Sequence, residues 1–337
     1  MKAVTCIKYG KPEEVLQMVE VDKPIPMENE VLIKVMATTV NAADCNARGL
    51  SYIPTGLGFL AKLMLGFNKP KKSILGSVLA GEVESVGNDV KRFKPGDRIY
   101  GSSEKLGAYA EYASWSVKSA LTIIPKNINF EEAATIPYGA LTALYFLQDM
   151  AKIKSGQKVL IKGASGGVGV YAVQLAKYFG AEVTGVCSTR NTGFVKSLGA
   201  DKVIDYTTTD YTKTGEQWDV ILDVVVGKTS FSKNKNALTK NGKYLAIAGG
   251  LNDMLQMIWT SIFGGKMVFF GGGTNCEKLE NFIFINQLIE DGNLKPVVDK
   301  TFPFENLVEA HQYVEAGHKR GNVAVNMIQA NNQTAKK

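Results

Sequence analysis

The sequence predicts an α/β protein in which a small β-barrel is followed by a doubly wound parallel sheet. Three observations support this prediction. Residues 1–125 contain several short β-rich runs separated by Gly and Pro turns, which is typical of a small barrel. From about Asn127 onward, strand-length and helix-length segments alternate, which favours a parallel sheet with right-handed crossovers. A glycine-rich stretch, residues 163–169, lies between one such strand and one such helix.

In the first part, residues 31–40 and 77–86 are rich in β-branched side chains and predict strands. Residues 94–97 (KPGD) predict a turn, because Pro fixes the first central φ and Gly supplies the positive φ at the second. Residues 108–117 predict another short strand. These runs are the strands expected of the barrel.

The second part opens at Asn129, which forms with Glu132 the pattern of a capping box at a helix start. A further helix is expected over residues 140–152, after Pro137. The strands predicted next are 158–162, 182–187, 202–205, 220–225, 244–248 and 267–270, and the helices are 168–179, 192–198 and 279–291.

The composition is that of a globular protein, and it excludes several classes of function. The 337 residues are enough for about two domains. Lys and Arg number 39 and Asp and Glu 32, so the net charge of +7 permits an anionic ligand without requiring nucleic acid. The four cysteines and two histidines show no zinc-finger spacing, and so few cysteines argue against a disulfide scaffold.

No segment predicts a membrane span. The N-terminal residues lack the apolar core of a signal peptide, and the apolar stretches 57–67 and 254–270 are short or interrupted by Lys and Gly. We therefore expect a soluble, cytoplasmic protein. Residues 53–72 have an apolar centre with helical spacing, and three interpretations stay open: a packed helix, a lid over an apolar substrate, or a weak membrane-facing patch.

The glycine-rich stretch GASGGVG follows the strand KVLIK directly and opens the next helix. Glycines allow a tight turn and let backbone N–H groups approach a pyrophosphate at the helix N-terminus. The first glycine position of the dinucleotide pattern is Ala164, while Gly166 and Gly169 occupy the other two. A tight turn without a ligand is the alternative. The expected cofactor contacts are Ala164, Ser165, Gly166, Gly167, Val168 and Gly169.

The residues after the second strand of this region favour NADPH over NADH. An acidic residue there would bind the ribose 2′-hydroxyl of NAD, but the sequence reads Cys-Ser-Thr-Arg-Asn and has no acid until Asp201. Ser188 and Thr189 can donate hydrogen bonds, and Arg190 can pair with a 2′-phosphate. Tyr206 could cover the same pocket, although packing is the simpler role for it.

Four stretches together are typical of one known family: VNAAD (40–44), GASGGVGVYAVQLAKYFGAEV (163–183), CSTRN (187–191) and VKSLGADKVIDY (195–206). With them the chain resembles the zinc-independent quinone oxidoreductase branch of the medium-chain dehydrogenase/reductase superfamily. Within that branch it resembles the quinone and alkenal reductases of the chloroplast-envelope type. The resemblance implies a GroES-like catalytic domain (1–125), a Rossmann NADPH-binding domain (126–293) and a C-terminal return to the catalytic domain (294–337), with the active site between them.

The resemblance also assigns individual residues. Asn41 would lie beside the nicotinamide and the catalytic pocket, although a turn or helix-cap role stays open for it. Asp44 would orient backbone or a neighbour, and Thr142 in IPYGALTA would lie near the nicotinamide end of the cleft. The strand ends expected beside the cofactor are Asp223 and Val224, then Gly249, then Phe269 and Phe270.

Several positions differ from the family pattern. Val78 replaces a usual aspartate, the Ala-Gly order is inverted at Gly139-Ala140, and Asn322 replaces the lysine of a late Gly-Lys motif. We expect these differences to leave cofactor binding intact and to affect the substrate pocket.

The sequence predicts no catalytic metal. In zinc-dependent members of the superfamily a cysteine and a histidine ligand occupy positions that correspond here to Asn41 and Ser77, and neither residue is a good zinc ligand. Cys45 lies near the first position, but both histidines fall in the last 30 residues. Lewis-acid alcohol oxidation is therefore not expected.

Without a metal, the chemistry suits hydride transfer from NADPH to an acceptor that is already electrophilic, either a quinone or an α,β-unsaturated carbonyl. The developing oxygen charge then needs only hydrogen-bond donors and water. Asn41 and Tyr52 are the expected donors, although Tyr52 could equally be a packed aromatic. The expected partner is a small electrophilic molecule rather than nucleic acid. A non-catalytic NADPH-binding protein is the alternative function, and a homodimer stays open.

Overall fold

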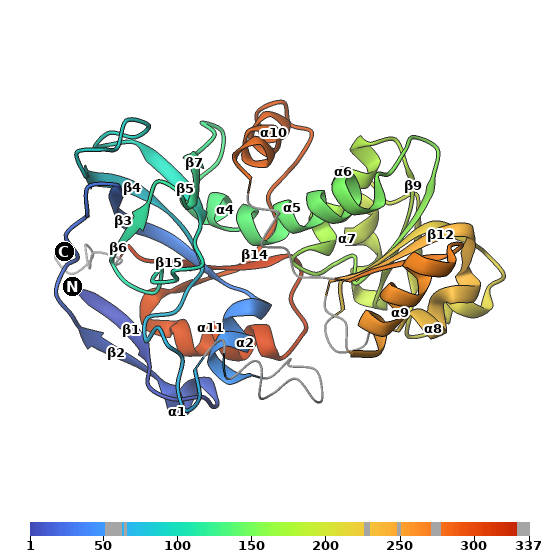
Figure 1. The fold of residues 1–337 in the computed structure, drawn as a ribbon, viewed down its shortest axis with the longest axis horizontal. Helices are drawn as coiled ribbons and strands as arrows, with labels where there is room; N and C mark the ends of the chain where they lie inside the picture. The colour runs from blue at the N-terminus through green and yellow to red at the C-terminus, as the bar shows by residue number, and fades with distance from the viewer. Residues whose placement is uncertain (51–62, 64–65, 226–229, 248–250, 271–277, 329–337) are drawn as a thin grey trace, which may run out of the picture.

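The computed structural model describes residues 1–50, 63, 66–225, 230–247, 251–270 and 278–328. Tyr52, Gly249 and most of residues 53–72, which the sequence singled out, lie outside the described residues. Two sheets lie at opposite ends of the long axis, with helix α5 between them (Figure 1). This is the mixed α/β architecture that the sequence predicts.

A six-stranded parallel sheet forms the second half of the molecule. Its order is β10-β9-β8-β11-β12-β13, so the chain winds outward from β8 in one direction and from β11 in the other. The predicted doubly wound sheet is therefore confirmed, and its switch point lies between β8 and β11. Its strands are β8 (Lys158–Lys162), β9 (Glu182–Cys187), β10 (Lys202–Asp205), β11 (Trp218–Asp223), β12 (Leu238–Ala246) and β13 (Met267–Phe270).

Two of these strands differ from their predicted bounds. β11 begins two residues before the predicted strand and leaves the sheet after Asp223. β12 begins at Leu238 rather than at residue 244, because its first half contains the polar sequence TKNGK, which gives no apolar signal. Both strands still run parallel to their neighbours, with a register shift between β11 and β12 after Trp218.

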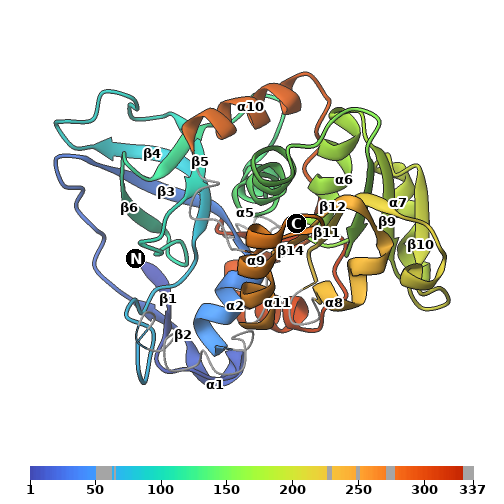
Figure 2. The same ribbon diagram turned by 45° about the vertical axis from the view of Figure 1, so that its right-hand side comes forward.

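Helices cover both faces of the six-stranded sheet. The connecting helical segments are α6 (Gly169–Tyr178), η2 (Thr189–Asn191), α7 (Thr192–Ser197), η3 (Tyr211–Lys213), α8 (Phe231–Asn234), η4 (Lys235–Ala237) and α9 (Leu251–Phe263), and α10 (Leu279–Glu290) follows β13. The sequence analysis did not predict α9, which packs beside β13 and next to α8 (Figure 2). Among the described residues, none of the helices has both the length and the apolar character needed to cross a membrane.

A seven-stranded sheet forms the first half, with β1 and β2 paired separately. Its order is β14-β15-β3-β4-β5-β7, and β6 also pairs with β3. The strands are β1 (Lys2–Cys6), β2 (Leu16–Glu20), β3 (Glu30–Val40), β4 (Val78–Val86), β5 (Arg98–Ser102), β6 (Tyr112–Ser116), β7 (Ala120–Ile123), β14 (Val298–Pro303) and β15 (Asn322–Asn326). The helical segments are α1 (Pro12–Val15), α2 (Ala42–Gly49), η5 (Phe304–Asn306) and α11 (Leu307–Glu315).

The predicted strand 108–117 is shorter than expected, since β6 covers only its second half. The residues before β6 bond elsewhere: Val4 donates to the Tyr109 carbonyl at 2.8 Å, and Val35 donates to the Glu111 carbonyl at 2.9 Å. The chain therefore crosses from the β1 edge to β3 within one segment.

The connection between the sheets starts with the predicted capping box. The Asn129 side chain accepts from Glu132 N at 2.8 Å and the Glu132 carboxylate accepts from Asn129 N at 2.9 Å, which starts α4 (Phe130–Ala134). α5 (Ile136–Leu144) begins four residues earlier than predicted, because Pro137 fits in a first helical turn that needs no N–H donor there. The helix continues as a π-helix, η1 (Tyr145–Ala151).

Candidate active site

The glycine-rich turn follows β8 at the switch point of the six-stranded sheet. Gly163 has a φ of 82°, which favours glycine, and both Gly163 N and Ala164 N donate to the Val186 carbonyl at 3.0 and 3.1 Å. Gly166 N closes the turn by donating to the Gly163 carbonyl at 2.9 Å. The turn is therefore held by its own backbone and by β9.

Two glycines of this turn have different surroundings. A Cβ on Gly169 would lie 2.1 Å from the Gly163 carbonyl oxygen, so only glycine allows the helix to approach the turn so closely. A Cβ on Gly166 would meet only that same oxygen, at 3.3 Å. The space beside Gly166, at the N-terminus of the ten-residue helix α6, fits a phosphate group of a dinucleotide.

Helix α5 packs directly against this turn. A Cβ on Gly139 would lie 2.7 Å from the Gly167 carbonyl oxygen and 2.6 Å from the Tyr171 ring. The inverted Gly139-Ala140 order thus has a steric reason in this chain. Thr142 lies one helical turn further along α5 and is buried.

The C-terminal segment closes the other side of the turn, which the sequence analysis did not predict. Gly321 N donates to the Ser165 carbonyl at 2.8 Å, and the Asn322 amide donates to the Gly167 carbonyl at 3.2 Å. The Lys319 ammonium group lies 2.9 Å from the position that a Cβ on Gly167 would take, and it donates to the Gly321 carbonyl at 2.5 Å. Asn322, noted only as a departure from the family pattern, therefore ties β15 to the turn.

Lys319 is the cation beside the turn. It is half-buried, and desolvation lowers the pKa of its ammonium group to about 8, although Asp299 and Cys45 act in the opposite direction. At neutral pH it is charged and can face an anionic group. The adjacent basic residues Lys319 and Arg320 in the GHKRG segment could have indicated such a role.

The segment after β9 contains the residues predicted for the 2′-phosphate. Arg190 lies in η2 and its guanidinium donates to the His318 carbonyl at 3.0 Å, so it faces the same C-terminal segment as the turn. Asn191, which the sequence analysis missed, is buried and donates to Ser165 Oγ at 3.0 Å and Ser188 Oγ at 3.4 Å. The glycine turn and the Ser-Thr-Arg segment are thus one connected unit.

A carboxylate also reaches this segment. Asp205, at the end of β10, lies in register with Cys187 and accepts hydrogen bonds from the hydroxyls of Thr189 and Thr207, at 2.5 and 2.7 Å. The Thr189 hydroxyl, followed by the Thr207 N–H and hydroxyl, lowers the pKa of Asp205, so the carboxylate is ionised. Tyr206 follows it and is mostly exposed, which leaves its predicted cofactor contact open.

The predicted strand ends have unequal surroundings. The Asp223 carboxylate is fully buried, and it accepts from Lys162 Nζ and the Tyr244 hydroxyl, both at 2.8 Å, and from Val225 N at 3.1 Å. The oxygens of Asp223 therefore have a structural role. Val224 lies against the glycine turn, since a Cβ on Gly163 would be 2.9 Å from its Cγ2. Phe269 and Phe270 end β13, and the Phe269 side chain is half-buried.

Asn41 caps helix α2 with its side-chain oxygen, and its side-chain amide group is not used in the cap. Its side-chain oxygen accepts from Ala43 N at 2.8 Å and Asp44 N at 3.1 Å, while the Asp44 carboxylate accepts from Asn41 N at 3.1 Å. Asn41 is thus the cap residue of the alternative interpretation. However, its Nδ2 group is buried and has no hydrogen-bond partner among the described residues. A buried amide donor without a partner fits a substrate or cofactor oxygen.

Asp44 joins the two positions that would hold zinc in other members of the superfamily. Its second carboxylate oxygen accepts from Ser77 N at 3.3 Å and Ser77 Oγ at 3.2 Å. Burial raises the pKa of Asp44 to about 6 against the opposing effect of these hydrogen bonds, so the carboxylate is ionised at pH 7. Asp44 therefore positions Asn41 and Ser77, as the sequence predicted.

Strand β15 connects Asn41 to the glycine turn. Val323 pairs with Val40, the residue before Asn41, and Gly321 forms a parallel bridge with Gly166. Only one residue, Asn322, therefore lies between these two pairings. The structure thus brings the Asn41 amide and the glycine turn to one short segment of chain.

No group of three or more His, Cys, Asp or Glu side chains that could hold a metal ion occurs among the described residues. Cys45 and His311 do meet, with Sγ and Nδ1 3.6 Å apart in the interior. Desolvation raises the pKa of Cys45 to about 12 and lowers that of His311 to about 3, so both are neutral and behave as packed core residues.

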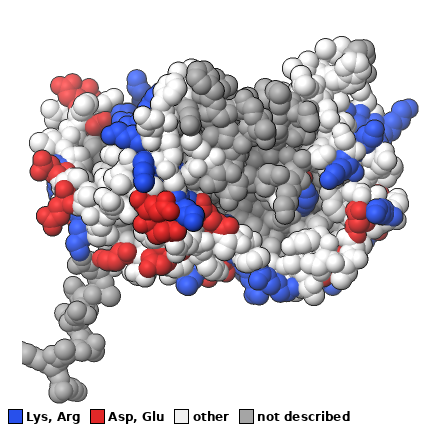
Figure 3. All heavy atoms as spheres, turned by 90° about the horizontal axis from the view of Figure 1, so that it is seen from below, with Lys and Arg blue, Asp and Glu red and all other residues white. Residues whose placement is uncertain are grey.

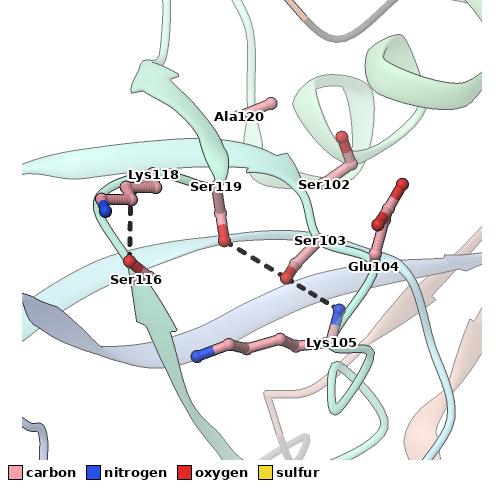
Figure 4. A pocket seen from close by; sticks show the side chains of 8 residues that line it. All are labelled: Ser102, Ser103, Glu104, Lys105, Ser116, Lys118, Ser119 and Ala120. Atoms are coloured by element: carbon pink, nitrogen blue, oxygen red, sulfur yellow. Dashed lines mark hydrogen bonds between the residues drawn. The ribbon is translucent and has the colours of Figure 1, made fainter. Parts of the chain in front are cut away.

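A polar pocket of about 470 Å³ lies elsewhere on the seven-stranded sheet (Figure 4). Ser103 and Ser119 share a hydrogen bond of 3.2 Å across it, and Lys105 and Lys118 line it. It contains none of the residues predicted for cofactor or substrate.

Known proteins are similar to this chain in sequence and in fold. The model of the alcohol dehydrogenase GroES-like domain matches residues 27–126, and the model described as zinc-binding dehydrogenase matches residues 198–325. The chloroplast envelope quinone oxidoreductase homolog of Arabidopsis thaliana is 35% identical over 96% of this chain and 98% of its own length.

Solved structures of quinone oxidoreductases have the same fold. The quinone oxidoreductase of Coxiella burnetii superposes with a TM-score of 0.85 at 30% identity, covering 97% of this chain and 99% of that chain. The Escherichia coli quinone oxidoreductase, solved in complex with NADPH, gives 0.82 at 27% identity over 97% and 100%. The protein is an oxidoreductase and belongs to the quinone oxidoreductase branch of the medium-chain dehydrogenase/reductase superfamily.

Proposed function

We propose that the protein reduces a quinone or an α,β-unsaturated carbonyl compound with NADPH and without zinc. The observation that supports this most strongly is the buried, unpartnered Asn41 amide next to β15, the strand that also closes the glycine turn. A donor at that place can stabilise the oxygen of an acceptor whose carbon accepts a hydride.

The described residues fit NADPH as the hydride source. The turn at 163–169 would hold the pyrophosphate through backbone N–H groups, with Lys319 beside it. Arg190, with the hydroxyl of Ser188, would hold the 2′-phosphate, because the Thr189 hydroxyl already donates to Asp205. When bound, NADPH supplies the hydride.

The protein's own residues then position the acceptor and its charge. Asn41 Nδ2 donates a hydrogen bond to the carbonyl oxygen that gains negative charge, and a neighbouring water delivers the proton. Asp44 holds Asn41 N and Ser77 through its two oxygens, so the donor does not need to reorganise during the reaction. Because Asn41 and Ser77 bind Asp44 rather than presenting Cys and His ligands, the reaction proposed here needs no zinc.

The preference for NADPH rests on charge. Arg190 favours a 2′-phosphate, whereas the ionised Asp205 disfavours one. The Thr189 and Thr207 hydroxyls already occupy the Asp205 oxygens, which weakens its repulsion. We therefore expect Arg190 to dominate.

Steady-state kinetics with a panel of quinones and enals test the proposal. We expect turnover with NADPH, unchanged by a zinc chelator, and a kcat/KM for NADPH well above that for NADH. Arg190→Glu should lower kcat/KM for NADPH by about 100-fold and change that for NADH little. Lys213→Glu is the matched control, because it makes the same charge change at an exposed site of the same half.

Two outcomes would contradict the proposal. If no acceptor is reduced although NADPH binds tightly, the protein is a non-catalytic NADPH-binding protein. If Arg190→Glu weakens both cofactors equally, Arg190 does not bind the 2′-phosphate.

A further inference from the structure

The interior of the first half of the molecule contains polar groups without partners. Among the described residues, seven buried polar side-chain atoms make no hydrogen bond, and four of them lie in or around helix α2. One is Asn41 Nδ2, which the proposed function uses. The others are Thr39 Oγ1, Arg48 Nε and His311 Nε2, and these residues are 4%, 1% and 0% exposed. Buried groups of this kind are ordinarily satisfied by ordered water.

These groups belong to one connected cluster. The Tyr109 hydroxyl donates to the Thr39 carbonyl at 3.3 Å, and the Tyr109 ring meets the His311 ring edge-on, with centroids 5.7 Å apart. On its other side, His311 Nδ1 lies 3.6 Å from Cys45 Sγ in α2. The cluster therefore extends from the end of β3, two residues before Asn41, to helix α11.

Arg48 lies at the outer end of this cluster. Its two Nη groups donate to the Gly10 carbonyl and to the Glu315 carboxylate, and Nε is left over. Desolvation and then the charge of Arg48 lower the pKa of His311 to about 3, so the two side chains act on each other inside the domain. The Glu315 side chain is 25% exposed, and the cluster therefore reaches the surface there.

The surface at this end of the cluster is acidic. Glu13 and Glu14 on α1 and Glu309 on α11 are exposed near Glu315, and Gln312 Nε2 ties the two helices together by donating to Glu13 at 3.1 Å. Seen from below, acidic side chains gather on this half of the molecule (Figure 3). A negative surface raises the local concentration of cations, protons included.

We propose that ordered waters occupy this interior and carry a proton from the Glu315 surface to the Asn41 site. The inference rests on the proposed function, in which a hydride adds to the acceptor and an electron pair moves to its oxygen. That oxygen takes a proton from the water beside Asn41, and this water regains one from the next water along the path. Solvent supplies the last proton, so no other reactant is needed. Thr39 and His311 are positioning residues, because they hold the waters.

The two side chains have the chemistry that this role requires. His311 packs in the core, but its Nε2 atom still needs a partner. The ring is neutral, so one nitrogen donates and the other accepts, and with Nδ1 at the Cys45 thiol, Nε2 can bind a water in either sense. The Thr39 hydroxyl likewise donates and accepts. Waters held in this way can reorient after each proton has passed.

A high-resolution crystal structure of the full-length protein is the first test. We expect ordered waters about 2.7–3.2 Å from Thr39 Oγ1 and from His311 Nε2. This measurement needs no acceptor, so it does not depend on turnover. An interior without water at both atoms would overturn the proposal, even if the protein reduces quinones.

Two adjacent threonines provide matched variants for kinetics. Thr39→Val keeps the shape of the side chain and removes the unpartnered hydroxyl, so kcat should fall by about tenfold and the solvent deuterium isotope effect on kcat should rise. Thr38→Val is the control, because Thr38 is also buried but its hydroxyl donates to the Val78 carbonyl at 2.7 Å. It should lower the melting temperature and keep the native isotope effect. Equal isotope effects in the two variants would overturn the proposal.

Variants of His311 test the middle of the path. His311→Gln keeps an amide nitrogen near the position of Nε2 and should retain most of the native kcat, whereas His311→Leu should behave like Thr39→Val. A native isotope effect in His311→Leu would also contradict the proposal. NADPH affinity should be unchanged in every variant. If the native protein reduced no acceptor, the proposed function would fail, whereas turnover without these isotope effects would contradict the proton path alone.

Discussion

The two parts of the candidate active site are built in different ways. The glycine turn is short in sequence, and its shape comes from backbone conformation and close approach, as Gly163 and Gly169 show. The Asn41 site is built from side chains that meet from distant segments, namely Asn41, Asp44 and Ser77, with β15 arriving from the C-terminus. A side chain added at one of these glycines should therefore disrupt the turn, whereas the Asn41 site should be disrupted by removing one hydrogen-bonding group.

The largest effect is expected at the turn. Gly169→Ala places a Cβ 2.1 Å from the Gly163 carbonyl oxygen, which is backbone and cannot move without opening the turn. We expect NADPH affinity to fall by about 100-fold or more and the free energy of unfolding to fall by about 1–3 kcal/mol. Calorimetric titration and urea unfolding measure both. Gly193→Ala in α7 is the control, since nothing lies within 4 Å of its Cβ, and it should be neutral or stabilising. Unchanged NADPH affinity in Gly169→Ala would show that the turn does not bind the cofactor.

Loss of the Asn41 amide donor should lower the turnover number and leave the stability of the protein nearly unchanged. Asn41→Ser keeps a good helix cap but removes the buried amide donor, so we expect kcat to fall by about 100-fold with little change in melting temperature. Asn41→Ala should additionally lose about 1 kcal/mol of stability with the cap. Asn129→Ser makes the same change in the other capping box and should leave kcat unchanged. Equal kcat in Asn41→Ser and the native protein would leave Asn41 with a capping role alone.

Lys319 should make the binding of NADPH at the glycine turn depend on pH. Its pKa of about 8 means that it is charged below pH 8 and loses its proton above that value. An anionic cofactor prefers the charged form, so the Kd for NADPH should rise above pH 8, by at most about tenfold per pH unit. Lys319→Arg stays charged and should give a flat profile over the same range. Fluorescence titration of NADPH from pH 7 to pH 9.5 measures this, and a flat profile in the native protein would exclude Lys319 from the cofactor site.

The smallest effect is expected at Asp205. Asp205→Asn removes a negative charge near the predicted 2′-phosphate site, so the KM for NADPH should fall by about twofold at low salt, while that for NADH stays the same. Asp210→Asn is the control, because Asp210 is likewise exposed and bonds Thr212 as Asp205 bonds Thr207. A fall in KM that is the same for both cofactors would place Asp205 away from the 2′-phosphate.

The sequence predicted features that local spacing controls. The strand–turn–helix at 158–178, the Asn129 cap and most strands of the six-stranded sheet lie close to where apolar periodicity, the capping pattern and glycine placed them. The errors have local reasons as well. The polar first half of β12 gave no apolar signal, and Pro137 was treated as preceding its helix although it fits inside the first turn.

Some features could not be predicted, because they depend on contacts between distant segments. The positions of Lys319 and Asn322 at the turn depend on the return of the chain through β15, some 150 residues after the turn. The meeting of Asp205 with Thr189 depends on the register of β10 and β9. The exposure of Ile258 and Ile262 on α9 depends on which side of the helix packs on the sheet. A periodic apolar pattern in the sequence is the same whether that side is buried or exposed.

The sequence by itself determined the fold class, the glycine turn between strand and helix, and the absence of zinc-type ligands at Asn41 and Ser77, because these follow from residue type and short-range backbone geometry. Only the tertiary structure decided that Asp44 joins those two positions, that β15 connects Asn41 to the turn, and that α9 faces away from the core. The physical reason is that long-range packing, and not local conformational preference, decides which polar atoms find partners and which apolar faces stay in contact with solvent.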